Sequence, residues 1–136
     1  STIMILMTAC AGAFTSKYGA SLACSKWPFC NDSFYPNFND QFEVIHFIHR
    51  VLAIILLIIL FLLLYRLKRY YSHFDISNKI AFYLIPSIIF LQVTVGALLI
   101  VYKIPIWMGV FHQFMGLLLF STLSFFVFNV RVKSSK

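Results

Sequence analysis

The chain has 136 residues, of which 61% are hydrophobic and 11% are charged, whereas ordinary soluble domains have about 45–50% and about 25%. This composition excludes a soluble α/β enzyme and is typical of membrane proteins. Four spanning helices of about 20 residues each fit this length and leave room for one long loop. We therefore predict an all-α integral membrane protein, a four-transmembrane-helix bundle that forms a single domain over residues 1–136.

The net charge of +7 indicates membrane topology and does not point to a nucleic-acid partner. Basic residues lie between the second and third apolar runs and after the fourth, at Arg66, Lys68, Arg69, Lys79, Arg131, Lys133 and Lys136. Short loops rich in Lys and Arg stay on the cytoplasmic side of a membrane. Three of the four acidic residues instead accompany the stretch after the first run, at Asp32, Asp40 and Glu43. We expect both termini to be cytoplasmic and this stretch to be extracytoplasmic.

The first apolar run, residues 3–14, is too short to cross a hydrocarbon core of about 30 Å. We expect a helix over about residues 1–16, with the chain as given starting inside it. The alternative is a cleaved signal peptide, but no basic segment precedes the run. Residues 17–41 are rich in Ser, Asn, Asp, Gly and Pro and are predicted to form one long external loop.

Three longer apolar runs follow the loop. They predict helices over about residues 42–66, 80–102 and 106–130. A short connection is expected at residues 70–78, between the second and third helices. Pro86 falls inside the third run, where a membrane helix tolerates it as a kink.

Two histidines are expected at one depth in the membrane. His49 lies about seven residues into the second predicted helix and His112 about seven residues into the fourth. Both helices are counted inward from the outer face, so at about 1.5 Å per residue both imidazoles lie roughly 10 Å below it. Equal depth suits the two axial ligands of a haem iron. The alternatives are two buried imidazoles bonded to backbone carbonyls, or a proton path.

Small and basic residues accompany these histidines. Gly109 and Gly116 flank His112 at i−3 and i+4, where they would clear space for a flat porphyrin. Arg50 directly follows His49 and is expected either to neutralise a haem propionate or to reach the lipid headgroups. Both glycines and Arg50 are therefore candidate cofactor-binding residues.

Other polar or sulfur-containing residues are assigned packing roles. Gln92 and Gly96 share one face of the third helix and suit close contact with a neighbouring helix. Met108 and Met115 are expected to pack and not to ligate iron. Cys10, inside the first helix, is expected to be a small core residue.

Cys24 and Cys30 lie on either side of a Trp-Pro pair in the external loop. An extracytoplasmic loop is an oxidising environment, and the two thiols could close a small ring there. Such a ring is a simple staple, a redox-active dithiol or the edge of a lid, and the residues alone leave these alternatives open.

In order and spacing these residues resemble haem A synthase. The matching segments are residues 12–17, 22–24, 27–30, 49–50, 91–92, 96–98 and 112. The loop is the most specific of them, because the family reads approximately Leu-Ala-Cys-x-x-Trp-Pro-Leu-Cys and this chain differs only at Phe29. Usual family members have two similar four-helix halves. The chain resembles the amino-terminal half, and compact four-helix members occur in prokaryotes.

The resemblance implies oxidation of the 8-methyl group of haem O to the formyl group of haem A in a prokaryotic cell membrane. It assigns His49 and His112 as the haem-ligating pair and Cys24 and Cys30 as an external disulfide. Haem b, haem O and haem A are the candidate cofactors. Eight-helix members hold two haem sites and one half offers one, so a homodimer would restore two.

One position departs from the family pattern. Members commonly carry a carboxylate three residues before the first ligating histidine, where this chain has His46. Glu43 lies one turn further out, so Glu43 and His46 are the candidate catalytic residues. The alternative function is a non-catalytic haem b-binding subunit of a respiratory membrane complex, such as a terminal oxidase. A cofactor-free structural subunit is the third possibility, and membrane lipids are expected partners in every case.

Overall fold

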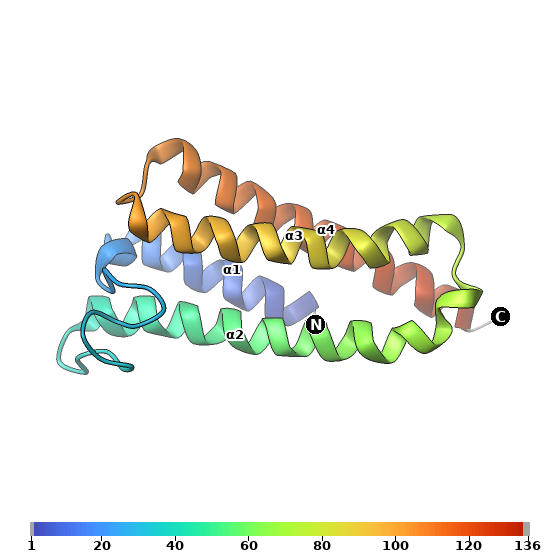
Figure 1. Ribbon diagram of the computed structural model, residues 1–136, viewed down its shortest axis with the longest axis horizontal. Coiled ribbons are helices and arrows are strands. Elements are labelled where there is room, and N and C mark those ends of the chain that lie inside the picture. The colour runs from blue at the N-terminus through green and yellow to red at the C-terminus, as the bar shows by residue number, and fades with distance from the viewer. Residues whose placement is uncertain (1, 135–136) are drawn as a thin grey trace.

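The computed structural model describes residues 2–134, with side chains described as far as residue 130. Its four helices are α1 (Thr2–Lys17), α2 (Gln41–Leu67), α3 (Ile76–Val101) and α4 (Ile106–Ser134), as Figure 1 shows. No strand occurs within residues 2–134, where Cys30 and Ser33 form only an isolated bridge. The all-α prediction is therefore confirmed. Of the basic residues expected at the carboxyl end, Lys136 and the side chains of Arg131 and Lys133 lie outside this description.

Three segments are long and apolar enough to cross a membrane. They run over Gln41–His73, Ile76–Val101 and Ile106–Val130, with mean hydropathies of 2.9, 2.4 and 1.7. Large apolar side chains such as Phe61 and Phe90 remain about 70% exposed on the bundle surface, as expected where lipid is the solvent. The chain is a membrane protein.

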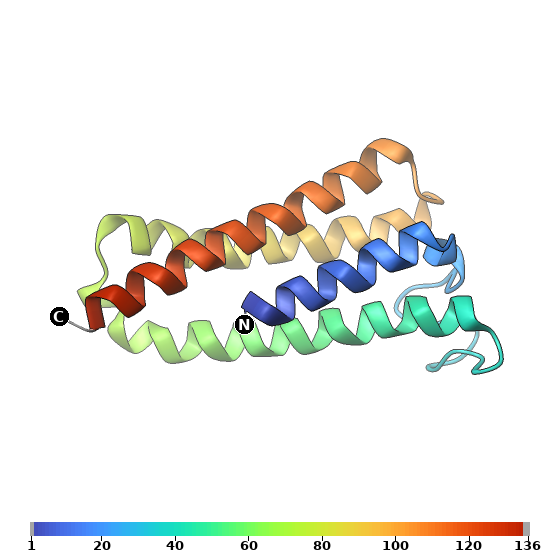
Figure 2. The same ribbon diagram turned by 180° about the vertical axis from the view of Figure 1, so that it is seen from behind.

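The helices form two antiparallel hairpins. α1 packs against α2 and α3 against α4, and α1 also contacts α4. In Figures 1 and 2, α2 and α4 both begin at the end of the bundle that carries the long loop. Their other ends lie together at the opposite end of the bundle, beside the short 3₁₀ turn Lys68–His73. Residues near the starts of α2 and α4 are therefore brought to the same end.

An aliphatic and aromatic core fills the half of the bundle distant from the loop. Its members come from all four helices and the α2–α3 connection, and include Ile5, Leu56, Leu60, Phe74, Ile85, Leu119, Leu123 and Phe126. Phe126 is fully buried and meets Phe74 edge to face, with ring centroids 5.6 Å apart. Apolar packing thus holds together the half distant from the loop, whereas the half near the loop also buries polar side chains such as Thr15 and His46.

Two expectations about helix boundaries and packing need correction. α3 begins at Ile76, four residues earlier than predicted, because the Asp75 side chain accepts a hydrogen bond from the Asn78 backbone N–H and caps the helix. Cys10 is exposed and is not a core residue. The buried face of α1 carries Ile5, Thr8 and Thr15, and the helical period places residue 10 on the other side.

Candidate functional site

His49 of α2 lies directly against the backbone of α1. Its ring nitrogen Nδ1 is 3.1 Å from the carbonyl oxygen of Thr8. A Cβ atom added to Gly12 would lie only 2.9 Å from His49 Cε1. The ring therefore occupies a place that any residue larger than glycine would block. A carbonyl can only accept, so Nδ1 carries the proton and Nε2 keeps a free lone pair.

His112 of α4 has a matching position against α3. A Cβ atom added to Gly96 would lie 3.1 Å from His112 Cε1. His112 Nε2 is 3.4 Å from the amide nitrogen of Gln92. Its other ring nitrogen, Nδ1, is buried and has no hydrogen-bond partner among the described residues. As with His49, one ring nitrogen is engaged and the other has no protein partner.

The two imidazoles lie at one level of the bundle. Gly12 is five residues before Lys17, where α1 ends, and Gly96 is five residues before Val101, where α3 ends. Both helices end at the loop end of the bundle (Figure 2). The structure thus places both histidines at the same level of the bundle, each packed against a glycine of the neighbouring helix.

The two glycines expected to clear space beside His112 have different surroundings. A Cβ atom added to the half-buried Gly109 would meet nothing within 4 Å, so open space remains there. At Gly116, the added Cβ would lie 3.3 Å from the Gln92 amide nitrogen. The space over Gly116 is therefore taken by Gln92, which corrects the expectation that it is left for a porphyrin.

Arg50 holds the external loop. Its guanidinium donates hydrogen bonds to three loop carbonyls, those of Cys24 at 2.7 Å, Phe29 at 2.8 Å and Lys26 at 3.0 Å. Its Nε lies 3.2 Å from His46 Nε2. Four of its five N–H donors are thus engaged within the protein. In this structure its guanidinium is bonded to the loop, a contact that neither expected role, propionate binding or headgroup contact, includes.

Glu43 and His46 also face the loop. The Glu43 carboxylate accepts hydrogen bonds from the Asn37 backbone N–H and the Asn31 side-chain amide, both at 2.8 Å. His46 is only 5% exposed, and its Nδ1 lies 3.3 Å from the backbone nitrogen of Cys24. One face of α2 therefore anchors the loop through these two side chains and Arg50.

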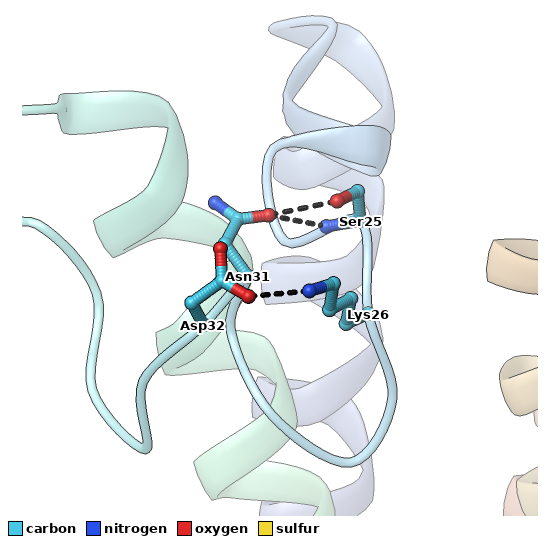
Figure 3. Close-up of polar contacts among 4 residues, drawn as sticks. All are labelled: Ser25, Lys26, Asn31 and Asp32. Carbon is cyan, nitrogen blue, oxygen red and sulfur yellow. Dashed lines mark hydrogen bonds and ion pairs between the residues drawn. The ribbon is translucent and has the colours of Figure 1, made fainter.

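The loop itself is closed near its base. Cys24 and Cys30 form a disulfide with their Cα atoms 4.4 Å apart. The Asn31 side-chain oxygen accepts hydrogen bonds from the backbone N–H and the hydroxyl of Ser25, and Lys26 pairs with Asp32 (Figure 3). These contacts join the segments on either side of the disulfide, so the loop forms a defined cap beside the first turns of α2.

Sequence reasoning missed several of these residues. The loop anchor Asn31 and the carbonyl of Thr8 had no recognisable signal, because their partners are remote in sequence. Gly12 could have been found, since it stands as far from the end of its helix as Gly96 does from the end of α3. Gln92 was noted for helix contact without its partner His112 being identified.

The donor set suits a haem better than a bare metal ion. Within the described part of the chain, no cluster of three or more His, Cys, Asp or Glu side chains could hold an ion. A haem iron needs only two axial ligands from the protein because the macrocycle supplies the others. The buried and unpartnered Nδ1 of His112 fits this requirement, as does the Nε2 of His49, which the bond from Nδ1 to the Thr8 carbonyl leaves free. Open space beside Gly109 is also available.

Comparisons with a family model and with individual known proteins give matches that agree with one another. Residues 1–124 match a family described as cytochrome oxidase assembly protein, COX15-CtaA. The chain is similar to a protein named heme A synthase from Flavobacterium psychrophilum, with 26% identity over 135 residues, covering 90% of this chain and 39% of that protein. It is also similar to a heme A synthase from Macrococcus caseolyticus, with 32% identity over 126 residues, covering 93% of this chain and 42% of that protein. The chain thus spans less than half the length of these relatives, and no solved structure matches it.

Proposed function

We propose, for a chain that belongs to the COX15-CtaA family of cytochrome oxidase assembly proteins, that it binds haem between His49 and His112 and takes part in making haem A. The observation that carries this proposal is the pair of imidazoles at one level, each with one nitrogen engaged by the neighbouring helix. Its relatives named heme A synthase support the same assignment.

The reaction proposed is oxidation of the 8-methyl group of haem O to the formyl group of haem A through successive hydroxylations, with an electron acceptor outside this chain taking up the electrons removed. When bound, the haem iron supplies the redox chemistry. His49 and His112 hold and orient the haem, and Gly109 leaves space beside it. Glu43 and His46 are the candidate proton-handling groups, and in the structure both lie at the base of the loop.

The proposed setting is a prokaryotic cell membrane, with both termini on the cytoplasmic side and the cysteine loop outside. The charge distribution supports this orientation. Arg66 and the turn Lys68–His73 lie at the end of the bundle opposite the loop. Basic segments of this kind stay in the cytoplasm.

Haem extraction from cells tests the proposed reaction. The chain is expressed with a source of haem O in a host that makes no haem A, and the extracted haems are separated by chromatography. We expect haem A to appear, and to be absent with the His112→Ala variant. Haem O that stays unconverted while the purified protein carries haem would contradict the synthase assignment.

A second candidate is a non-catalytic haem b-binding subunit of a respiratory complex. It is favoured by the engagement of Glu43 and His46 with the loop, which ties both candidate catalytic side chains to structural contacts. This function predicts bound haem b without conversion and co-migration with a terminal oxidase in native gels. A homodimer would instead migrate at twice the mass of the chain and carry two haem sites. Purified protein without a Soret band would indicate a cofactor-free subunit.

A further inference from the structure

Gln92 connects three features of the α3–α4 hairpin. Its amide nitrogen lies 3.4 Å from His112 Nε2, and its amide oxygen is buried without a hydrogen-bond partner among the described residues. The amide lies over Gly116, where an added Cβ would come within 3.3 Å of it. A buried polar atom without a partner costs free energy. The burial of a glutamine at this position is therefore not explained by packing alone, and it needs a further reason.

The α1–α2 hairpin shows what that reason is. There, the backbone carbonyl of Thr8 accepts the proton of His49 Nδ1 and fixes which ring nitrogen stays free. A backbone carbonyl can only accept, whereas a side-chain amide can present either its oxygen or its nitrogen after rotating about its last bond. Gln92 occupies the corresponding place beside His112, but its amide can rotate to present either a donor or an acceptor to the ring.

We infer that Gln92 is the positioning residue for His112 and that the absence of a side chain at Gly116 leaves room for its amide. This inference rests on the proposed haem site. A histidine that binds iron through one nitrogen keeps a proton on the other and donates it to an acceptor, which fixes the ring and makes it a better ligand. With haem bound, the Gln92 oxygen would turn toward His112 and gain the partner that it lacks.

Two substitutions separate this role from simple packing. Gln92→Leu removes the acceptor while keeping a similar volume, and Gln92→Glu keeps an acceptor of nearly the same shape. The matched control is Gln113→Leu, the same change at the exposed residue that follows His112. The readouts are the amount of haem retained by the purified protein and its reduction potential.

We expect Gln92→Leu to weaken haem retention about 10- to 100-fold and to raise the reduction potential, because a His112 without an acceptor donates less electron density to ferric iron. Gln92→Glu should retain haem, with a potential equal to or below that of the wild type. Gln113→Leu should leave both properties unchanged. A packing role would instead shift the potential in the same direction with Leu and Glu.

Gly116→Ala provides an independent test that leaves Gln92 intact. The added methyl group would lie 3.3 Å from the amide nitrogen and push the amide aside by a few tenths of an ångström, so the potential should rise in the same direction as with Gln92→Leu but by less. Wild-type haem retention and potential in both Gln92→Leu and Gly116→Ala would overturn the inference but leave the haem site standing. A wild-type protein that binds no haem would overturn the proposed function and this inference together.

Discussion

Gly12 and Gly96 each lie where an imidazole of the neighbouring helix touches the backbone. Their role is steric: neither position is in a turn, and both lie inside a helix. The absence of a side chain lets His49 reach the Thr8 carbonyl and lets His112 approach α3. At this scale, one missing methyl group determines where an imidazole ring can lie.

Gly12→Ala should therefore displace His49. The new Cβ would lie 2.9 Å from the ring, and the helix backbone cannot move away without disturbing its neighbours. We expect haem content per protein to fall about tenfold, as for the loss of a group that orients a metal ligand. The control Ala13→Val enlarges the next residue, which is exposed. Full haem content in the Gly12→Ala protein would contradict the proposal that His49 must pack against Gly12 in order to bind haem.

Arg50→Leu tests the anchoring of the loop. The change removes hydrogen bonds to three loop carbonyls and to His46. Bonds from a charged donor are stronger than neutral ones, so we expect limited proteolysis within the loop to become at least about tenfold faster. Arg66→Leu, at the exposed far end of α2, is the control. Equal cleavage rates in both variants and the wild type would show that Arg50 does not hold the loop.

At the scale of the elements, the end of α3 shows local strain. Lys103 and Ile104 have φ angles of +54° and +58°, which side-chain-bearing residues rarely adopt. The Ile104 N–H donates a hydrogen bond to the Leu99 carbonyl at 2.8 Å, five residues earlier in the chain. This is the 6→1 bond of a Schellman motif. Glycine is the usual residue in the left-handed position of such an ending.

Lys103→Gly should stabilise the protein. Relief of the left-handed penalty is worth about 1 kcal/mol, which should raise the unfolding temperature measured in detergent. Lys103→Ala keeps the Cβ atom and should give no such increase. An unfolding temperature at or below that of the wild type for Lys103→Gly would contradict this account of the turn.

The helices and their order could be predicted from the sequence because apolar runs and helix-breaking residues are local signals. The α3 boundary differs from the prediction because the apolar run begins only at Ile80, whereas the Asp75 side chain caps the helix one turn earlier. The contacts of Gln92, Gly116 and Arg50 could not be predicted, because they depend on how neighbouring helices and the loop are aligned. Equal depth of the histidines needed only counting along each helix, but the two glycines against which they pack needed the structure.

The whole molecule consists of two hairpins with related polar sites. Each pairs a glycine near the end of a helix that runs toward the loop end of the bundle with a histidine near the start of the next helix. The apolar core occupies the other half of the bundle. A haem bound between the histidines would therefore lie near the loop end of the bundle, which in the proposed topology is the extracytoplasmic side.

Cysteine accessibility tests this topology. In a Cys10→Ala background, Asn39→Cys places a thiol in the loop and Ser72→Cys places one in the turn at the opposite end, both at exposed positions. A membrane-impermeant thiol reagent added to intact spheroplasts should label only the Asn39→Cys protein. In inside-out vesicles the pattern should reverse. Labelling of Ser72→Cys in spheroplasts would show that the bundle has the opposite orientation.

The electron paramagnetic resonance spectrum of the oxidised, haem-loaded protein tests the central claim most directly. Two imidazole ligands on one ferric iron give a low-spin signal. We predict this signal for the wild type, and its conversion to a high-spin signal or its loss with the haem in both His49→Ala and His112→Ala. A high-spin wild type, or a low-spin signal that survives either substitution, would contradict a haem held between these two helices.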